Sequence, residues 1–184
     1  IDTFRFEEDK VLEGALGALG AGAWDAVAAW AAIRVDPKPM EASFWLRRDP
    51  SRQAAWQLVH GAARLGQCIA RAGERIQESG SLDGAIDAYV ERGAAVDQAH
   101  RHLEQRRAAL LYPPISEFET LRARLDDMRR AWRDWADVLA RGFNALCRTH
   151  GFLPAVSHQQ RTIFDEVVKP MTQEAGTTAY FVVA

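Results

Sequence analysis

The longest run of helical periodicity in the chain lies between Ser116 and His150. Its large apolar residues alternate in steps of three and four, and they are Phe118, Leu121, Leu125, Met128, Trp132, Trp135 and Leu139. This spacing averages about 3.5 residues, so one apolar seam faces a partner helix along the whole length. Ser116 followed by Glu119 predicts a capping box at the start, and Gly151 predicts the C-terminal cap. The pattern therefore predicts a single helix about 50 Å long.

Two further stretches carry the same alternation. The first runs from Pro50 to about Glu78, with seam positions Ala55, Leu58, Ala62, Leu65, Ile69, Ala72 and Ile76. The second covers residues 82–111, with Leu82, Ile86, Tyr89, Gly93, Val96, His100, Leu103, Arg107 and Leu110. Asp49 and Ser81 are the predicted N-caps of these two helices. Three long seams joined by short turns predict antiparallel neighbours that bury their seams against one another.

Shorter elements flank the long helices. Two short helical patterns near the N-terminus predict a hairpin that caps one end of the bundle. Ser157 with Gln160 predicts a capping box for a C-terminal helix, and Thr177–Val183 is β-branched and aromatic, as in a strand. The predicted divisions are a hairpin (1–34), a linker (35–49), a long-helix antiparallel bundle (50–151), a C-terminal helix (152–176) and a strand stub (177–184). The predicted fold is all-α, an elongated antiparallel helical bundle with a C-terminal β-strand stub.

Composition narrows the class of protein. The chain has 184 residues, a formal net charge of -2 and two cysteines. This charge argues against generic binding to nucleic acid, which needs a strongly basic face. No apolar run approaches the ~20 residues of a membrane span, and no signal-peptide pattern opens the sequence. Cys68 and Cys147 lie among apolar neighbours, so we expect two reduced, packed thiols in a cytoplasmic protein.

Polar residues interrupt the seam of the helix predicted over residues 82–111, and they supply the candidate contact site. Gly93 would let another backbone approach closely, while His100 and Arg107 need polar partners or an open stretch of the bundle. Asp97, His100 and Glu104 share one helix face and could hold a metal ion, although a convincing zinc or iron site needs more ligands. An interhelical ion pair or hydrogen bond is the alternative, so we assign no metal, cofactor or catalytic residue. The candidate partner contacts are Gly93, Asp97, His100 and Arg107.

The 116–150 helix also interleaves arginines with aspartates. Four pairs lie four residues apart, namely Asp126–Arg130, Arg130–Asp134, Arg133–Asp137 and Asp137–Arg141. This spacing favours a solvated, salt-bridged face, with each pair contributing only ~0.3–0.5 kcal/mol. A phosphate-binding surface is the alternative, and the interleaved carboxylates work against it.

Four phrases of the sequence stand out together. They are Ser43-Phe44-Trp45-Leu46-Arg47-Arg48-Asp49-Pro50, Tyr89-Val90-Glu91 with Val96-Asp97-Gln98-Ala99-His100-Arg101, Val167-Val168-Lys169-Pro170 and Ala179-Tyr180-Phe181-Val182-Val183. Together they resemble the PglZ family, the alkaline-phosphatase-like component of bacteriophage exclusion (BREX) systems. The last phrase is similar to the first strand of that family's catalytic domain, so 177–184 would begin a truncated phosphatase-like domain. By element order the resemblance covers about residues 24–184.

The sequence departs from the family at the decisive position. The resemblance implies that the strand ends in an aspartate that binds a metal ion, at the edge where α/β sites form. Ala184 stands there instead, either because the fragment is cut at that point or because the aspartate was removed. Phosphoester hydrolysis by such enzymes needs metal ions, so we expect this chain alone to be catalytically inert, with divalent metal confined to the missing catalytic domain. Ile1 in place of a start Met indicates that the chain begins inside a longer protein.

These observations lead to one hypothesis and two alternatives. The hypothesis is a non-catalytic helical region of a PglZ-type phage-defence protein that docks or scaffolds protein partners, expected to be other BREX components. The resemblance implies that the parent protein is a metal-dependent phosphatase or phosphodiesterase of the alkaline phosphatase superfamily. The first alternative is a stand-alone coiled-coil adaptor that self-associates through its seams. The second is a helical domain that binds nucleic acid through the 116–150 helix.

Overall fold

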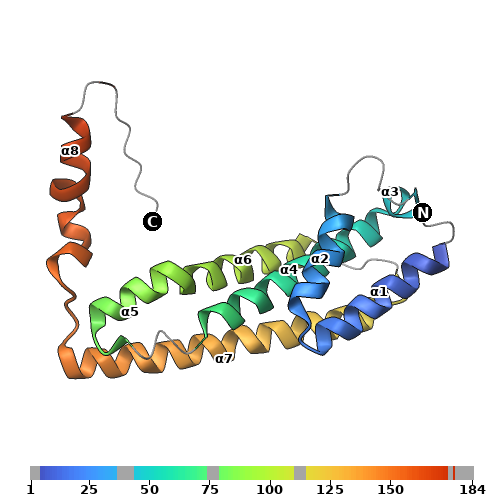
Figure 1. Ribbon diagram of the computed structural model, residues 1–184, viewed down its shortest axis with the longest axis horizontal. Coiled ribbons are helices and arrows are strands. Elements are labelled where there is room, and N and C mark those ends of the chain that lie inside the picture. The colour runs from blue at the N-terminus through green and yellow to red at the C-terminus, as the bar shows by residue number, and fades with distance from the viewer. Residues whose placement is uncertain (1–4, 37–43, 74–78, 110–114, 174–175, 177–184) are drawn as a thin grey trace.

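The regular structure in the described part of the chain is helical, which confirms the all-α class there (Figure 1). The structure, a computed structural model, describes residues 5–36, 44–73, 79–109, 115–173 and 176. The strand predicted at 177–183 lies outside these residues, and so do Ile76 and Leu110 of the predicted seams.

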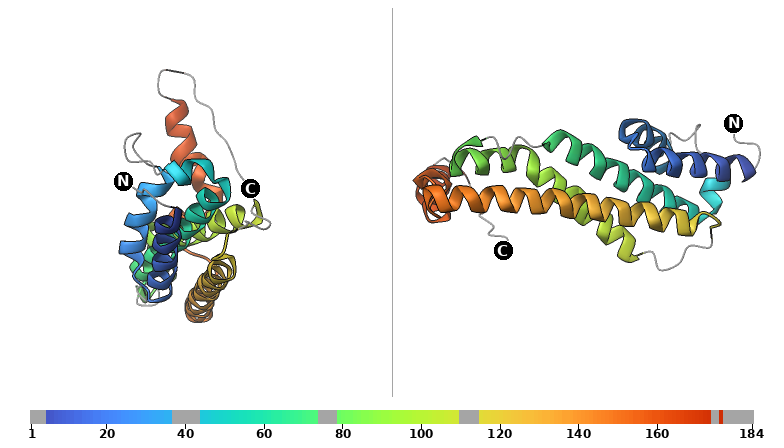
Figure 2. Two further views of the ribbon diagram at one scale, coloured as in Figure 1. Left: turned by 90° about the vertical axis from the view of Figure 1, so that its right-hand side faces the viewer. Right: turned by 90° about the horizontal axis from the view of Figure 1, so that it is seen from below.

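The elements fall into an elongated part and a short projection. The elongated part, here called the helical body, comprises α1 (Arg5–Gly20), α2 (Trp24–Val35), α3 (Phe44–Arg48), α4 (Pro50–Ala72), α5 (Leu82–Ala88), the π-helical turn η2 (Tyr89–Gly93), α6 (Ala94–Ala109) and α7 (Phe118–His150). The projection, here called the arm, comprises the short turns η3 (Val156–His158), η4 (Gln160–Thr162) and η5 (Phe164–Val168), followed by α8 (Lys169–Thr172). Figure 2 shows the arm at one end of the body, standing across its long direction.

Three helix ends follow the capping chemistry of the sequence. Asp49 Oδ1 accepts a hydrogen bond from the backbone N–H of Arg52 at 3.1 Å. Ser81 Oγ accepts one from the backbone N–H of Gly84, also at 3.1 Å. Gly151 ends α7 with a φ of 85°, a left-handed conformation that glycine adopts without strain. These predicted caps are confirmed.

Two predicted capping boxes are wrong. α7 begins at Phe118, with Glu117 at the N-cap position and no side-chain hydrogen bond there. Ser116 instead lies in a turn closed by a bond from the Phe118 N–H to the Ile115 carbonyl at 3.3 Å. Because the Ile115 side chain is buried, packing rather than capping fixes this start. Ser157 likewise lies inside the turn η3, where no side-chain cap forms.

α4 is the central helix of the body, in contact with α1, α2, α6 and α7. Two glycines allow these neighbours to come close. The indole of Trp24 lies over Gly66, and the Leu103 side chain lies over Gly61, so a Cβ at Gly66 would clash with the indole. The predicted α4 seam is buried at Ala55, Leu58, Ala62, Leu65 and Ala72.

The α1–α2 hairpin packs against α4 and lies toward the end of the body opposite the arm (Figure 1). The contact from Trp24 to Gly66 and that from Arg34 to Trp56 mark the two ends of the α2–α4 interface. On α1 the buried apolar face consists of Leu12, Ala15, Leu16 and Leu19. A short helix, α3, occupies part of the segment predicted as a linker.

Two of the long helices differ from prediction. α4 ends at Ala72, where Gly73 takes a φ of 51°, although the seam pattern predicts a helix reaching Glu78. The predicted helix over 82–111 is divided by η2, a π-helical turn of the kind that often marks functional positions. These two departures lie at the same level of the molecule and shape the site described next.

Candidate functional site

The apolar seam of α7 is fully buried in its first half only. Its fully buried members are Leu121, Leu125 and Met128. Trp132 and Trp135 are partly buried against the same core, whereas Phe143 is 37% exposed. The first half faces α4 and α1, and beyond the end of α4 at Ala72 the helix faces α5. The residues of the predicted seam are therefore buried or half-buried throughout, but the partner helix changes along its length.

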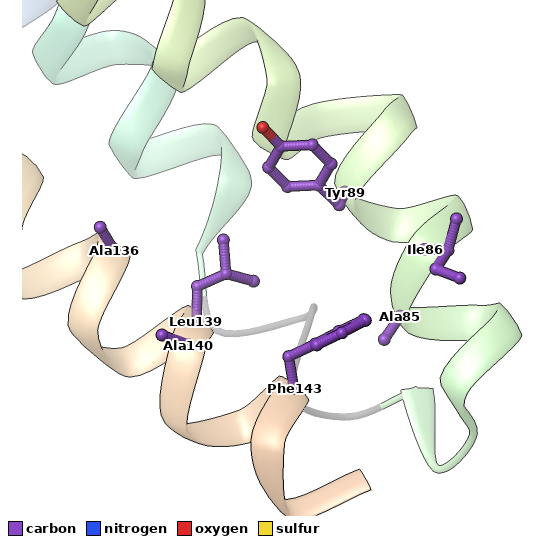
Figure 3. Close-up of a pocket in the computed structure, with 7 residues that line it drawn as sticks. All are labelled: Ala85, Ile86, Tyr89, Ala136, Leu139, Ala140 and Phe143. Atoms are coloured by element: carbon purple, nitrogen blue, oxygen red, sulfur yellow. The ribbon is translucent and has the colours of Figure 1, made fainter. Parts of the chain in front are cut away.

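Past the end of α4, the helices α5 and α7 continue and enclose an apolar groove with η2 (Figure 3). The lining residues are Ala85, Ile86, Tyr89, Ala136, Leu139, Ala140 and Phe143. The groove has a volume of about 340 Å³. In Figure 3 the Leu139 and Phe143 side chains project from α7 toward α5. We call this feature the α5–α7 groove; it lies where further turns of α4 would have packed.

Tyr89 closes the inner end of the groove. Its ring lies over Gly93, where any Cβ would collide with the ring. Its hydroxyl donates a hydrogen bond to Asp97 Oδ2 at 2.6 Å, and this bond, together with burial and the charge of Asp97, raises the pKa of Tyr89 to about 12. Gly93 thus accommodates the ring of Tyr89 from its own turn, and η2 also packs against α4.

Asp97 joins α6 to α7. Its second carboxylate oxygen accepts a hydrogen bond from Trp132 Nε1 at 3.0 Å. The His100 ring stacks on Trp132, with centroids 3.7 Å apart and planes inclined by 2°. Burial lowers the pKa of His100, against the opposing pull of the nearby carboxylates Glu104 and Asp97. The neutral ring therefore packs as an aromatic surface on the indole.

One turn further along α6, Glu104 binds two arginines. Arg107 Nη2 lies 2.8 Å from Glu104 Oε2, and Arg129 Nε of α7 lies 3.1 Å from Glu104 Oε1. Arg129 also lies 3.6 Å from Asp126. The pair of Glu104 with Arg129 bridges α6 and α7, and the other two pairs lie within one helix each.

The four candidate contact residues are thus brought close to one another, but in an internal contact. Asp97, His100 and Arg107 meet side chains of α7 or of their own helix, and Gly93 is covered by Tyr89. None of the four lines the α5–α7 groove. At this seam break the α7 side chains of Trp132 and Arg129 reach across to α6, while the Arg107 side chain stays 39% exposed.

The alternative of a metal site on the face of Asp97, His100 and Glu104 finds no support in the geometry. Asp97 accepts hydrogen bonds from an indole and a phenol, and Glu104 is paired with two guanidinium groups. Within the segments that the structure describes, no three His, Cys, Asp or Glu side chains converge as a metal shell would need. Both cysteines are free thiols.

A second cluster of charged side chains lies among α1, α2 and α4. It was not predicted from the sequence. Arg52 is 2% exposed and pairs with Asp9, while its Nε lies 3.7 Å from Asp49. Arg34 lies 3.6 Å from the buried Glu8. Breaking one partner of such a buried pair typically costs about 3–5 kcal/mol, so the cluster fixes the hairpin on α4.

A signal for this cluster was present in the seam spacing. Arg52 lies three residues before Ala55, so the α4 seam extended backwards passes through an arginine. A charged residue at a buried position requires a partner, and Asp9 supplies it from α1.

The charged face of α7 forms different pairs from those predicted. Of the four predicted pairs, Asp137–Arg141 is present, at 3.2 Å. Asp127 instead pairs with Arg124 at 2.8 Å and with Arg130, both at a spacing of three residues. Most of these arginines are occupied by carboxylates of the same helix, which leaves little charge for a phosphate backbone.

The comparisons with known proteins identify no relative of this chain. No protein-family model matches the chain, and neither a curated protein nor a solved structure is significantly similar to it. Among the helices that the structure describes, none combines the length and the apolar character needed to cross a bilayer.

Proposed function

We propose that this chain is a protein-docking module whose binding site is the α5–α7 groove. The observation that carries the proposal is an apolar trough of about 340 Å³, lined from α5, η2 and α7 and not covered by α4 or by any other helix that the structure describes. Contiguous exposed apolar surface of this kind marks interaction sites in soluble proteins, because leaving it in water is unfavourable.

The shape of the groove favours a helical partner. α5 and α7 run in opposite directions on either side of it, and α4 occupies the corresponding position in the neighbouring part of the body (Figure 1). A helix laid in line with α4 would therefore lie against α5 and α7, as α4 lies against α6 and α7. Helices that bind in such troughs present apolar anchors at positions i, i+3 or i+4, and i+7.

For the parent protein, we propose the helical region that precedes the phosphatase-like domain of a PglZ-type protein, with other BREX components as partners. The support is the resemblance of the four sequence phrases. In this proposal the chemistry and its divalent metal belong to the following domain, and the present chain positions partners beside it.

Direct binding measurements test the proposal. Each purified BREX component would be titrated against the chain and against Leu139→Glu, which places a charge in the groove. Val138→Glu is the matched control, because Val138 is the neighbouring α7 residue, is 38% exposed and lies outside the lining. We expect Leu139→Glu to weaken binding at least about tenfold, equivalent to ~1.4 kcal/mol, and Val138→Glu to leave it unchanged.

Two results would count against the proposal. Equal binding by the two variants would show that the groove is not the binding site. A complete lack of binding to every component would show that the partners are not BREX components.

The self-associating adaptor remains the second candidate, and one observation favours it. Four residues of the arm, Ile163, Phe164, Val167 and Met171, are between 37% and 61% exposed, so the chain itself carries apolar helical surface without a cover. The long seams that first suggested self-association are, in contrast, largely used within the body.

A further inference from the structure

The arm has the features of a ligand for the α5–α7 groove. Phe164, Val167 and Met171 are 61%, 51% and 52% exposed, and they fall at positions i, i+3 and i+7. This is the anchor spacing that an amphipathic α-helix uses in an apolar trough; here Phe164 and Val167 lie in the π-helical turn η5 and Met171 lies in α8. η5 and α8 are consecutive turns of one helical stretch whose main contacts among the described elements lie within the arm, and Phe164 and Val167 stay more than half exposed.

The arm does not fill the groove of its own chain. Its root is held on α5 by His158, whose Nε2 lies 2.8 Å from Asp87 Oδ1 and whose Nδ1 lies 3.0 Å from Asp83 Oδ1. The backbone N–H of Ala155 also donates to Asp83 at 2.8 Å. Neither aspartate lines the groove, and from this attachment the arm stands across the body (Figures 1 and 2).

Charge on the two surfaces is complementary. Arg133 lies three residues before Ala136 and seven before Ala140, which places it beside the groove lining on the same side of α7. Glu166 lies next to Val167 on the arm. Both charged residues are exposed, and neither forms an ion pair with another residue that the structure describes.

We infer that the groove of one copy of this chain receives the arm of a second copy. The inference deepens the proposed docking function and rests on it, because it names the occupant of the same groove. When each copy gives its arm to the other, the same two surfaces meet twice around a two-fold axis, and the assembly closes as a dimer. Phe164, Val167 and Met171 then lie against Leu139 and Phe143, and Glu166 faces Arg133.

The experiment is sedimentation equilibrium of the full chain over a wide concentration range. Two variants each remove one surface: Phe164→Glu on the arm and Leu139→Glu in the groove. Val138→Glu is the control outside both surfaces. We expect the unchanged chain and the control to dimerise, and each of the two variants to raise the dimer dissociation constant about 30-fold or more, as loss of a central anchor does.

Mixing the two variants separates arm-in-groove binding from contact between two arms or between two grooves. A heterodimer of Phe164→Glu with Leu139→Glu retains one intact arm and one intact groove that match. We expect the mixture to dimerise more tightly than either variant alone. Failure of the mixture to recover any association overturns the inference, and circular dichroism with thermal melting checks that both variants keep the fold of the parent chain.

A cross-linking experiment identifies which chain donates the arm. Val167→Cys and Leu139→Cys would be combined in one chain in which Cys68 and Cys147 are replaced by serine. Oxidation is expected to give a disulfide between two chains, seen as twice the mass on a non-reducing gel. A disulfide confined to the monomer would show the arm closing on its own groove and would overturn the second-copy occupant.

These experiments distinguish failure of the inference from failure of the proposed docking function. A chain that stays monomeric at every concentration overturns the inference, whereas the docking function survives if Leu139→Glu still weakens binding to a BREX component. If the chain dimerises but binds no BREX component, the inference stands and the BREX partners are rejected.

Discussion

The two halves of α7 have the same apolar spacing but opposite surroundings. In the first half, Leu121, Leu125 and Met128 are at most 4% exposed beneath α4 and α1. In the second half, Leu139 and Phe143 continue the spacing but line an open groove. A heptad pattern therefore shows that a helix face needs cover, but it does not show whether the same chain supplies the cover.

The end of α4 creates the difference. Gly73 takes a φ of 51°, which stops the helix, and the Gly73 N–H closes the last turn on the Ile69 carbonyl at 3.0 Å. α5 and α7 continue beyond this level, so the third side of the packing is lost. Tyr89 stands at the boundary, with its ring in the groove and its hydroxyl bonded to Asp97 on the covered side.

The largest expected effect contrasts the same substitution in the two halves. Leu125→Ala should lower the free energy of unfolding by about 2–5 kcal/mol, because it leaves a cavity under α4. Leu139→Ala should cost about 1 kcal/mol or less, because its side chain is only partly buried. Both substitutions change the helix propensity equally. Urea unfolding, at a protein concentration low enough to keep the chain monomeric, therefore compares the contribution of side-chain burial at the two positions. Equal losses would show that the second half is covered after all.

A glycine pair sharpens the boundary between the halves. Gly93→Ala would push its methyl group into the Tyr89 ring, and we expect a loss of about 1–3 kcal/mol because the ring must move from its place. Gly14→Ala on α1 meets open space and should gain up to about 1 kcal/mol from lower backbone entropy. Thermal melting compares the two. A gain at Gly93 would show that the ring does not occupy the position described.

The carboxylate of Asp97 provides a spectroscopic measure of the same boundary. Asp97→Asn removes the charge that favours the neutral phenol, so the pKa of Tyr89 should fall from about 12 toward its ordinary value near 10. Absorbance at alkaline pH follows the phenolate directly. Asp134→Asn is the control, because that aspartate is exposed on α7 and has no ion pair with another described residue. An unchanged titration would mean that the bond between the two residues is not formed in solution.

The sequence predicts the covered part of the molecule well and the open part poorly. The α4 seam, the caps at Asp49 and Ser81 and the end at Gly151 depend on local spacing and local hydrogen bonds, which a pattern records. The groove depends on where one helix stops relative to two others, and the Arg52 cluster depends on which buried charge meets which. Both depend on tertiary contacts, and the seam spacing shows at most that Arg52 needs a partner, not which residue supplies it.

The candidate contact residues also show that the sequence does not identify the partner of a polar side chain. A polar residue on a seam indicates that a polar partner exists, and this held for Arg107, which pairs with Glu104, whereas the His100 ring stacks on Trp132. The partner proved to be an indole or a carboxylate of this chain, because Trp132 and Glu104 reach the same level. The groove itself is built of ordinary apolar seam residues, so nothing in their type distinguishes them from core.

The smallest expected effect concerns the root of the arm, which is attached to the α5 side of the open half. The hydrogen bond to Asp87 raises the pKa of His158, with the charge of Asp83 acting in the same direction. A raised pKa in the folded state means that this contact stabilises fully below the unfolded value near 6.5 and is lost as pH rises through the folded value. Hydrogen exchange over residues 155–162, corrected for intrinsic rates, should therefore be slower at pH 6 than at pH 8.

Proton NMR of the His158 ring tests the cause of this pH dependence. Asp87→Asn should lower the pKa of His158 toward 6.5 and weaken the pH dependence of exchange at the root of the arm. Glu91→Gln, one turn further along, is the matched control, since Glu91 pairs with Arg92 at 3.2 Å and does not touch the histidine. The backbone bond from Ala155 to Asp83 persists in every case, so the arm stays attached while its root loosens. Identical titrations in the two variants would mean that the arm leaves α5 in solution, and the open half of α7 would then have no fixed neighbour beyond α5 itself.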